Sequence, residues 1–430
     1  MVRLVAYVGL ASFCTLGSIQ RLAAQSLVIT NARIIDGNGG AIARGSVVVQ
    51  DGRIVSVSDG APAHAPGAQT IDAKGMTVMP GFIDAHRHVM QGDGAQWLKE
   101  QAVQRMQEFL DAGFTTIFSC GDPLEPILEL RRRLKAGEIK GPRLWAVGRV
   151  PLARAAVGFR AGVDPARVDL SRPPDRPTKA ATAIPHEETL ATVRSLAKAG
   201  VDAFKMAIIV TPGGPEKDTL SVITAEARHL GIPTITHAVT VEDALAAVEA
   251  HTSVLAHTPH IGQLTEEQAR TIAASGIPMM STVGIFLPTF AEDNTRVRAR
   301  TGDDNLPRFR DLDPFPMNTL SSAGQGPVNA RMLWDAGITY GYGTDTSFLP
   351  RDSLAQELRA LRLVFSRKDI IKIMTINAAK VIGRSNELGT LEPGKLADMV
   401  IVAGDPLADI EHVLKVKMVI KGGEIAVDRR

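Results

Sequence analysis

The sequence predicts an α/β fold: a closed (β/α)8 barrel of the TIM type, with a small β-sandwich built from both ends of the chain. Eight apolar, strand-like runs alternate with helix-like stretches over about three hundred residues, which is the rhythm of a parallel barrel. Short alternating strands with polar turns lie at both ends. The 430 residues, 45% of them apolar, suffice for one large core and a smaller second core.

The first residues have the pattern of a targeting segment. Arg3 precedes an apolar run over residues 4–16, and Leu22, Ala23 and Ala24 stand where a signal peptidase could cut. We therefore predict a signal peptide over residues 1–24 and a periplasmic or secreted protein; the alternative is an uncleaved amphipathic start. After cleavage Cys120 is the only cysteine left, so no intramolecular disulfide is expected.

The charge of the chain is nearly balanced, at a net +2. Both surplus basic residues, Arg3 and Arg21, lie within the predicted signal peptide, so the rest of the chain is neutral by formal count. No charge excess indicates a nucleic acid or, after processing, a membrane surface as the partner. We expect a small molecule instead.

Strand patterns at the two ends predict a single β domain. Near the N-terminus they cover residues 26–35, 46–50 and 53–57, the last two joined by the turn Asp51-Gly52, which is a strong hairpin signal. Near the C-terminus they cover residues 399–402, 417–420 and 424–427. Pairing both ends gives sandwich segments over residues 25–78 and 388–430, with a barrel domain over residues 79–387 between them.

The barrel domain alternates strands with helices. The first expected strand ends at His88, and the others cover residues 115–119, 143–150, 203–210, 233–239, 253–256, 278–283 and 338–343. The clearest helices cover residues 96–112, 187–199, 224–230, 241–250 and 266–274. Two long connections, residues 151–185 and 284–327, are expected to form lids or substrate walls. An open doubly wound sheet is the alternative, but no Gly-x-Gly-x-x-Gly or Gly-Lys-Ser/Thr loop follows a strand.

Polar residues stand at the C-terminal ends of these strands, where barrel enzymes carry their chemistry. The set is His86, His88, Lys205, His237, His257 and Asp345. His86 and His88 are spaced by two along a strand, so they point to the same face and can share one metal ion. Each residue alone is more often structural, and a lysine is usually exposed. Their joint placement at strand ends predicts a shared metal site.

The motifs around these residues resemble those of the amidohydrolase superfamily. Residues 80–88 (PGFIDAHRH) look like its opening signature, and residues 377–380 (NAAK) and 389–398 (GTLEPGKLAD) look like its closing one. The resemblance covers nearly the whole chain after the predicted signal peptide. It is nearest to the branch of imidazolonepropionase-like proteins, metal-dependent Xaa-Pro dipeptidases and ochratoxin-hydrolysing enzymes.

Four histidines and an aspartate can bind one ion completely or two incompletely, and a catalyst needs incomplete coordination. The resemblance implies two divalent metal ions, with Zn²⁺ the expected metal, and a carbamate on Lys205 whose oxygens bridge them. The predicted division is His86, His88 and Asp345 on the more buried ion, His237 and His257 on the more exposed ion, and carbamylated Lys205 on both.

The resemblance implies a binuclear metal-dependent hydrolase. The expected reaction is cleavage of an amide bond in a small N-acyl amino acid, a dipeptide or a related xenobiotic, as in a peptidase of the carboxypeptidase kind. A hydroxide between the metals would attack the acyl carbon, and Asp345 would pass the attacking proton to the leaving nitrogen. Alternatives are an esterase, lactonase or carbamate hydrolase on the same site, or a non-catalytic binding protein. Family members often form homo-oligomers.

Two departures from the family pattern bear on the substrate. Many relatives of the dipeptidase kind carry Gly-Gly-His-Gly after the third strand, whereas residues 148–151 read Gly-Arg-Val-Pro, so the pocket wall differs there. Deaminase-type relatives place a glutamate three residues after the histidine of the fifth strand. Here that residue is Thr240, which argues against a hydrolytic deaminase.

Weaker candidates surround the predicted centre. Asp84 shares a face with the histidine pair and either orients it or makes an ordinary structural hydrogen bond. His260 follows His257 by three residues and is placed to reach the barrel mouth. Three arginines after the third strand are either solvated or able to hold a substrate carboxylate; they are Arg149, Arg154 and Arg160.

Overall fold

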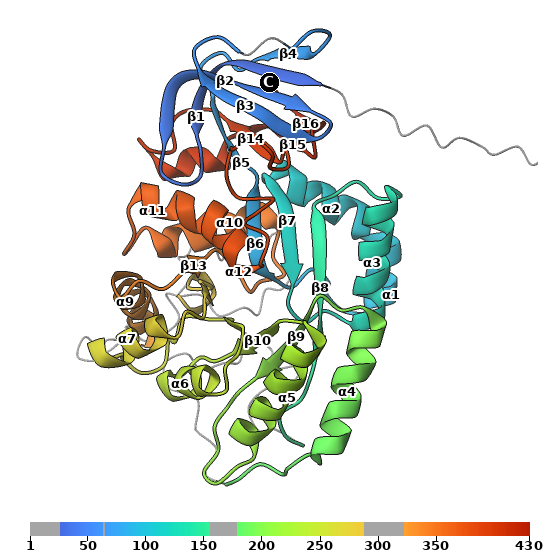
Figure 1. Cartoon of the computed structure of the whole chain (residues 1–430), viewed down its shortest axis with the longest axis vertical. Coiled ribbons are helices and arrows are strands. Elements are labelled where there is room, and N and C mark those ends of the chain that lie inside the picture. Colours follow the sequence, from blue (N-terminus) through green and yellow to red (C-terminus); the bar gives the residue numbers. More distant parts are fainter. Residues whose placement is uncertain (1–25, 63–64, 155–178, 288–321) are drawn as a thin grey trace, which may run out of the picture.

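The computed structural model describes residues 26–62, 65–154, 179–287 and 322–430. Within them the chain forms two eight-stranded sheets, one small sheet from both chain ends and one barrel sheet, as Figure 1 shows. The predicted fold class is confirmed. The predicted signal peptide, Arg160 and parts of both long connections lie outside the described residues. None of the described helices is long and apolar enough to cross a membrane.

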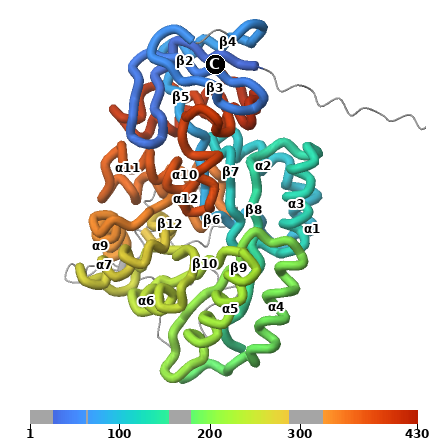
Figure 2. Tube along the Cα trace, viewed as in Figure 1, coloured from blue at the N-terminus to red at the C-terminus, as the bar shows by residue number. Residues whose placement is uncertain are grey.

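Strands from both ends of the chain form the small sheet, with the C-terminal strands side by side at one edge. Its strands are β1 (Leu27–Ile35), β2 (Ala41–Gln50), β3 (Arg53–Asp59), β4 (Gln69–Asp72), β5 (Thr77–Pro80), β14 (Met399–Val402), β15 (Val416–Lys421) and β16 (Glu424–Asp428). The order is β16-β15-β14-β5-β1-β2-β3, with β4 beside β1. The antiparallel pair β5–β14 joins the N-terminal strands to the C-terminal strands, which lie together at the top of Figure 2. The predicted hairpin is the pair β2–β3, with its turn at Asp51 and Gly52.

The barrel strands follow one another around the sheet in chain order, all parallel. They are β6 (Phe82–Arg87), β7 (Phe114–Ser119), β8 (Arg143–Arg149), β9 (Ala203–Ala207), β10 (Thr234–His237), β11 (Val254–Leu255), β12 (Met279–Met280) and β13 (Tyr340–Gly341). Backbone hydrogen bonds join the first strand to the segment after the last, from Ala85 N to Tyr342 O at 2.9 Å and from Asp345 N to His86 O at 2.8 Å. These bonds complete the ring, so the C-terminal ends of all eight strands meet at one mouth.

Helices cover the outside of the barrel sheet (Figure 1). The α-helices are α1 (Gly94–Glu100), α2 (Ala102–Asp111), α3 (Leu124–Ala136), α4 (His186–Ala199), α5 (Glu216–Leu230), α6 (Val241–Glu249), α7 (Glu266–Ala274), α9 (Ser322–Asp335), α10 (Pro350–Leu361), α11 (Arg367–Lys372) and α12 (Ala378–Val381). Shorter helical segments are η2 (Gly284–Phe286), η4 (Ile373–Asn377) and η5 (Ile410–Leu414).

Two sequence predictions about elements need correction. The helix expected over residues 96–112 is two helices, because the backbone of Gln101, with φ of −118°, interrupts it between α1 and α2. The strands expected over residues 253–256, 278–283 and 338–343 are only two residues long as β11, β12 and β13. Apolar runs at the ends of short buried strands continue into irregular segments that are equally buried, so hydrophobicity alone does not mark the strand end.

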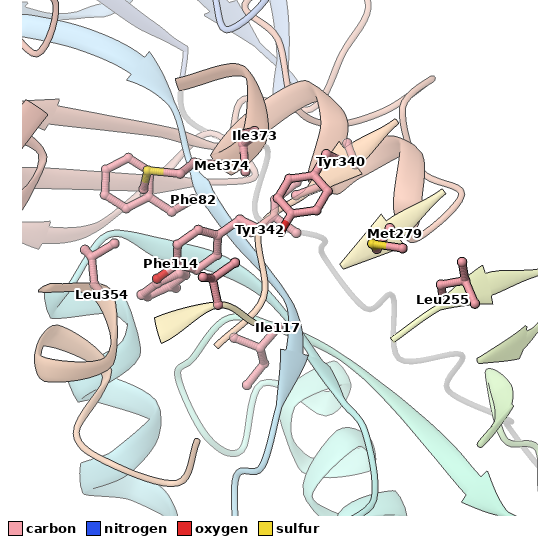
Figure 3. Close-up of a cluster of buried hydrophobic side chains, with 14 of the residues drawn as sticks. Phe82, Phe114, Ile117, Leu255, Met279, Tyr340, Tyr342, Leu354, Ile373 and Met374 are labelled. Carbon is pink, nitrogen blue, oxygen red and sulfur yellow. The ribbon is translucent and has the colours of Figure 1, made fainter. Parts of the chain in front are cut away.

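Aromatic rings from β6, β7 and the segment after β13 pack together in the barrel core. Phe82 and Phe114 pack edge to face with ring centroids 6.0 Å apart, and Phe114 also contacts Tyr342 at 6.0 Å. Figure 3 shows these three rings gathered in one cluster. Tyr342 is also one of the residues whose backbone closes the barrel, so this packing supports the closure.

We predict that Phe114→Ala lowers the free energy of unfolding by about 3 to 5 kcal/mol, because the ring is 1% exposed and its removal leaves a cavity. Urea denaturation monitored by circular dichroism measures this change. The matched control is Val103→Ala on α2, where the side chain is 68% exposed and the change should stay within about 0.5 kcal/mol. Equal effects of the two substitutions would contradict the prediction.

Candidate metal centre

The six predicted site residues meet in one cavity at the C-terminal mouth of the barrel. The cavity has a volume of about 630 Å³, and its lining includes His86, His88, Lys205, His237, His257 and Asp345. His86 lies within β6, Lys205 within β9, and His237 ends β10. His88, His257 and Asp345 lie just beyond the strand ends, in segments whose backbone remains tied to the sheet. Whether they bind metal stays a prediction; their convergence is a feature of the fold.

His86, His88 and Asp345 form the tightest group. The Nε2 atoms of His86 and His88 lie 3.1 Å and 3.0 Å from Oδ1 of Asp345. One potential ligand atom from each residue lies within 4.8 Å of the others. Two imidazole nitrogens and a carboxylate oxygen are ligands that zinc and similar divalent ions prefer. The donor set and its spacing therefore fit one metal ion.

A second pair of imidazoles lies beside this group. His237 Nδ1 and His257 Nε2 are 2.6 Å apart, and the rings of His86 and His257 have centroids 4.8 Å apart. His257 Nδ1 is held by the hydroxyl of Thr282 at 2.8 Å. This hydrogen bond fixes the ring orientation and leaves Nε2 directed toward His237. The two histidines thus converge, as ligands of one ion must.

Lys205 lies between the two groups. Its Nζ is 3.2 Å from His86 Nε2, and the residue is 9% exposed. Burial lowers the pKa of the Lys205 ammonium. A buried ammonium among imidazoles is costly unless an anion accompanies it, and a lower pKa increases the fraction of neutral amine. Neutral amine is the form that reacts with carbon dioxide.

The protonation states of His86, His237 and Asp345 suit metal ligands. Burial, together with the nearby charge of Lys205, lowers the pKa of His86 to about 4 and that of His237 to about 3. Both imidazoles are therefore neutral near pH 7. Although burial acts to raise it, the pKa of Asp345 is held well below its usual range by the neighbouring imidazoles, His86 first among them. Neutral imidazole and ionised carboxylate are the forms that bind metals.

Asp84 acts on the backbone rather than on the histidine rings. Its carboxylate accepts hydrogen bonds from the N–H groups of His86 at 3.2 Å and Thr344 at 3.1 Å, and from the Thr344 hydroxyl at 2.7 Å. Burial raises the pKa of Asp84 to about 6. Asp84 thereby fastens the segment before Asp345 to β6. We expected Asp84 either to orient the histidine pair or to make a structural hydrogen bond, and in the structure it makes structural hydrogen bonds.

Arg87 is a supporting residue that sequence reasoning missed. Its buried guanidinium donates to the hydroxyls of Thr344, Thr346 and Ser353 at 3.1, 2.8 and 2.7 Å, and also to the carbonyl of Phe348. It therefore holds both sides of Asp345. The signal was present, because strand alternation directs Arg87 away from the face of its two histidine neighbours and into the barrel wall.

Glu357 on α10 is a second support that the sequence did not reveal. It accepts the backbone N–H groups of Val283 at 3.0 Å and Gly284 at 2.6 Å, and burial raises its pKa to about 7. These bonds fix the segment that begins with Thr282, whose hydroxyl holds the ring of His257. The contact spans more than seventy residues of sequence, so no local motif indicates it.

The weaker candidates differ in whether they line the cavity. His260 stacks on Phe286 with ring centroids 3.6 Å apart and is not among the residues that line the cavity. Arg154 pairs with Glu188 on α4, whereas Arg149 lines the cavity. Thr240 caps α6: its side chain accepts the N–H of Asp243 at 3.0 Å.

A (β/α)8 barrel with histidines, a lysine and an aspartate converging at its C-terminal mouth defines a class of barrel hydrolases whose members typically depend on metals. The chain belongs to the amidohydrolase family, which it matches over residues 77–426. Imidazolonepropionase of Geobacillus kaustophilus (strain HTA426) is 26% identical over 442 residues, covering 90% of this chain and 91% of that protein. The family and branch expected from the sequence motifs are thereby confirmed.

Solved structures share the whole fold. A Xaa-Pro dipeptidase with bound methionine in its active site superimposes with a TM-score of 0.71 at 22% identity, covering 93% of this chain and 99% of that one. The ochratoxinase of A. niger gives a TM-score of 0.69 at 19% identity, covering 94% and 96%. At these identities the likeness concerns the fold alone.

We predict that His260 makes the folding stability depend on pH. Burial lowers its pKa from 6.5 to about 4, so between these values the unfolded chain binds a proton that the folded protein excludes. Its contribution is therefore present above about pH 6.5 and is lost as the pH falls toward 4. From pH 6.5 to 5 the wild type should lose about 1 to 2 kcal/mol more than His260→Phe does, measured by urea denaturation.

The control for this prediction is His251→Asn, which changes an exposed imidazole. Its stability should follow the wild type across the same pH range. If His260→Phe and the wild type lose stability in parallel, His260 is not the titrating group.

Proposed function

We propose that the protein is a binuclear metal-dependent amidohydrolase that cleaves an amide bond in a small N-acyl amino acid, a dipeptide or a related xenobiotic. The observation that carries the proposal is the convergence of His86, His88 and Asp345, together with the neighbouring histidine pair, on Lys205. This donor set exceeds what one tetrahedral ion needs. A charged and polar cluster of this size in an apolar cavity would be costly without cations to bind.

The ligands divide between two ions as their positions suggest. His86, His88 and Asp345 would hold the inner ion, and His237 with His257 the outer one. Carbamylation of Lys205 would give it two anionic oxygens, one for each ion. When bound, two divalent cations, Zn²⁺ being the expected metal, supply a Lewis acid for the acyl oxygen and lower the pKa of an attacking water toward neutrality.

The remaining chemistry belongs to residues of this chain. Asp345 is ionised, its side chain is 15% exposed, and it faces the cavity, so it can accept the proton of the attacking water. The same carboxyl can then deliver that proton to the leaving nitrogen, acting as base and then as acid. Thr240 is engaged in capping α6, so the position of the deaminase glutamate offers no carboxylate here.

We predict that Lys205→Ala lowers the metal content of the zinc-loaded protein from about two ions per chain to about one or fewer, because the bridging ligand is lost. Elemental analysis after gel filtration measures the content. Lys198→Ala, which removes an exposed lysine of α4, is the matched control and should keep both ions. An unchanged metal content in Lys205→Ala would reject the bridge.

Hydrolysis of N-acyl amino acids, dipeptides and carbamates tests the reaction class. We expect the zinc-, cobalt- or manganese-loaded protein to release the amine from at least one amide substrate, and chelation to abolish the activity. Amide and ester analogues with the same acyl group compare the leaving atoms. A preference for esters would favour an esterase, and full activity without metal would refute the proposal.

A further inference from the structure

Arg149 stands at the rim of the proposed centre, one strand away from Lys205. It is the last residue of β8, and its register partner on β9 is Lys205. The bond from Val150 N to Lys205 O, at 2.9 Å, fixes the two strand ends side by side. Arg149 is exposed and belongs to the lining of the cavity that holds the metal-ligand candidates.

The guanidinium of Arg149 is held against a glycine. A Cβ atom at Gly121 would lie 2.5 Å from Nη2 and 2.6 Å from Nε of Arg149, closer than any real contact of that kind. Gly121 also has φ of +141°, a conformation that other residues rarely adopt. The absence of a side chain at Gly121 therefore makes the place in which the Arg149 guanidinium lies.

Arg149 has no carboxylate partner among the described residues. Other arginines near the barrel strands do have one: Arg131 pairs with Asp202 and Arg143 with Asp398. The carboxylates that line the cavity are Asp345 and Glu216.

Both of these carboxylates are engaged elsewhere. Asp345 is beside the histidines, and Glu216 accepts from the hydroxyl of Thr211 at 2.6 Å and from its N–H at 3.3 Å. The cavity thus presents an arginine that no described carboxylate neutralises, and a ligand carboxylate can pair with it.

We infer, on the basis of the proposed function, that Arg149 binds a free carboxylate of the substrate and selects N-acyl amino acids or dipeptides with an unblocked C-terminus. The planar guanidinium can form two parallel hydrogen bonds with a carboxylate. The cavity that Arg149 and the candidate ligands share is largely apolar, and its lining includes Val150, Leu152, Met206, Ile209 and Phe286. An apolar side chain fits this lining while the amide carbonyl faces the metal-ligand candidates.

Binding of two tetrahedral mimics tests the inference without relying on turnover. The first is leucine with a methylphosphonyl group on its nitrogen, and the second is the same derivative of 3-methylbutylamine, which lacks only the carboxylate. Calorimetric titration of the zinc-loaded wild type should give a Kd about 10- to 100-fold lower for the first compound. Arg149→Met should abolish this preference without weakening the second compound, and Arg149→Lys should retain part of it.

Arg154→Met is the matched control, because Arg154 already pairs with Glu188, and it should keep the wild-type preference. If both compounds bind the wild type equally, or if Arg149→Met keeps the preference, the carboxylate subsite is wrong while the proposed hydrolase stands. If neither compound binds, the tetrahedral acyl site itself is absent, and both the proposed function and the subsite are overturned.

Discussion

The site depends on the closure of the barrel between β6 and the segment after β13. The backbone bond from Asp345 N to His86 O brings the last strand end against the first, and it sets Asp345 between His86 and His88. This approach requires Gly343, because a Cβ there would lie 2.8 Å from the Cβ of His86. Two neighbouring strands thus contribute three donor atoms because their backbones meet, and no loop rearrangement is needed to assemble them.

The convergence of the candidate residues in one cavity was predictable, because their positions follow from strand periodicity and from one rule about barrels. Alternation put His86 and His88 on one face, and the rule that strand C-termini share a mouth brought in Lys205 and His237 from distant segments. The contacts of Glu357 and the helix break at Gln101 were not predictable. Glu357 contacts Val283 and Gly284 across the fold, and the break of the helix at Gln101 has no proline or glycine to announce it. Contacts of this kind are set by packing in three dimensions, whereas periodicity reports only which face is buried.

Two of the residues with a positive φ other than glycine stand at the centre itself. Asp345 has φ of 53° and Thr282 has φ of 45°, a region that costs a residue with a Cβ free energy. Threonine is β-branched, so the cost is greatest at Thr282. Each is held by buried groups: Arg87 and Asp84 bind the segment around Asp345, and Glu357 binds the segment that follows Thr282. Buried polar networks therefore hold a strained backbone here. That backbone positions the carboxylate of Asp345 and, through Thr282, the imidazole of His257.

The cavity is lined by two groups of charged and polar side chains that differ in character. The first group is the cluster of histidines with a lysine and a carboxylate; under the proposed function, cations and a bridging anion would offset the cost of burying it. The second group is the guanidinium of Arg149, which lies against Gly121 where a Cβ atom would collide with it. With Arg149 in the inferred role, a ligand that spans both groups offers an oxygen to the cluster and a carboxylate to Arg149. The apolar residues of the lining add affinity but little discrimination, so the presence of both polar groups on the ligand becomes the main criterion of selection.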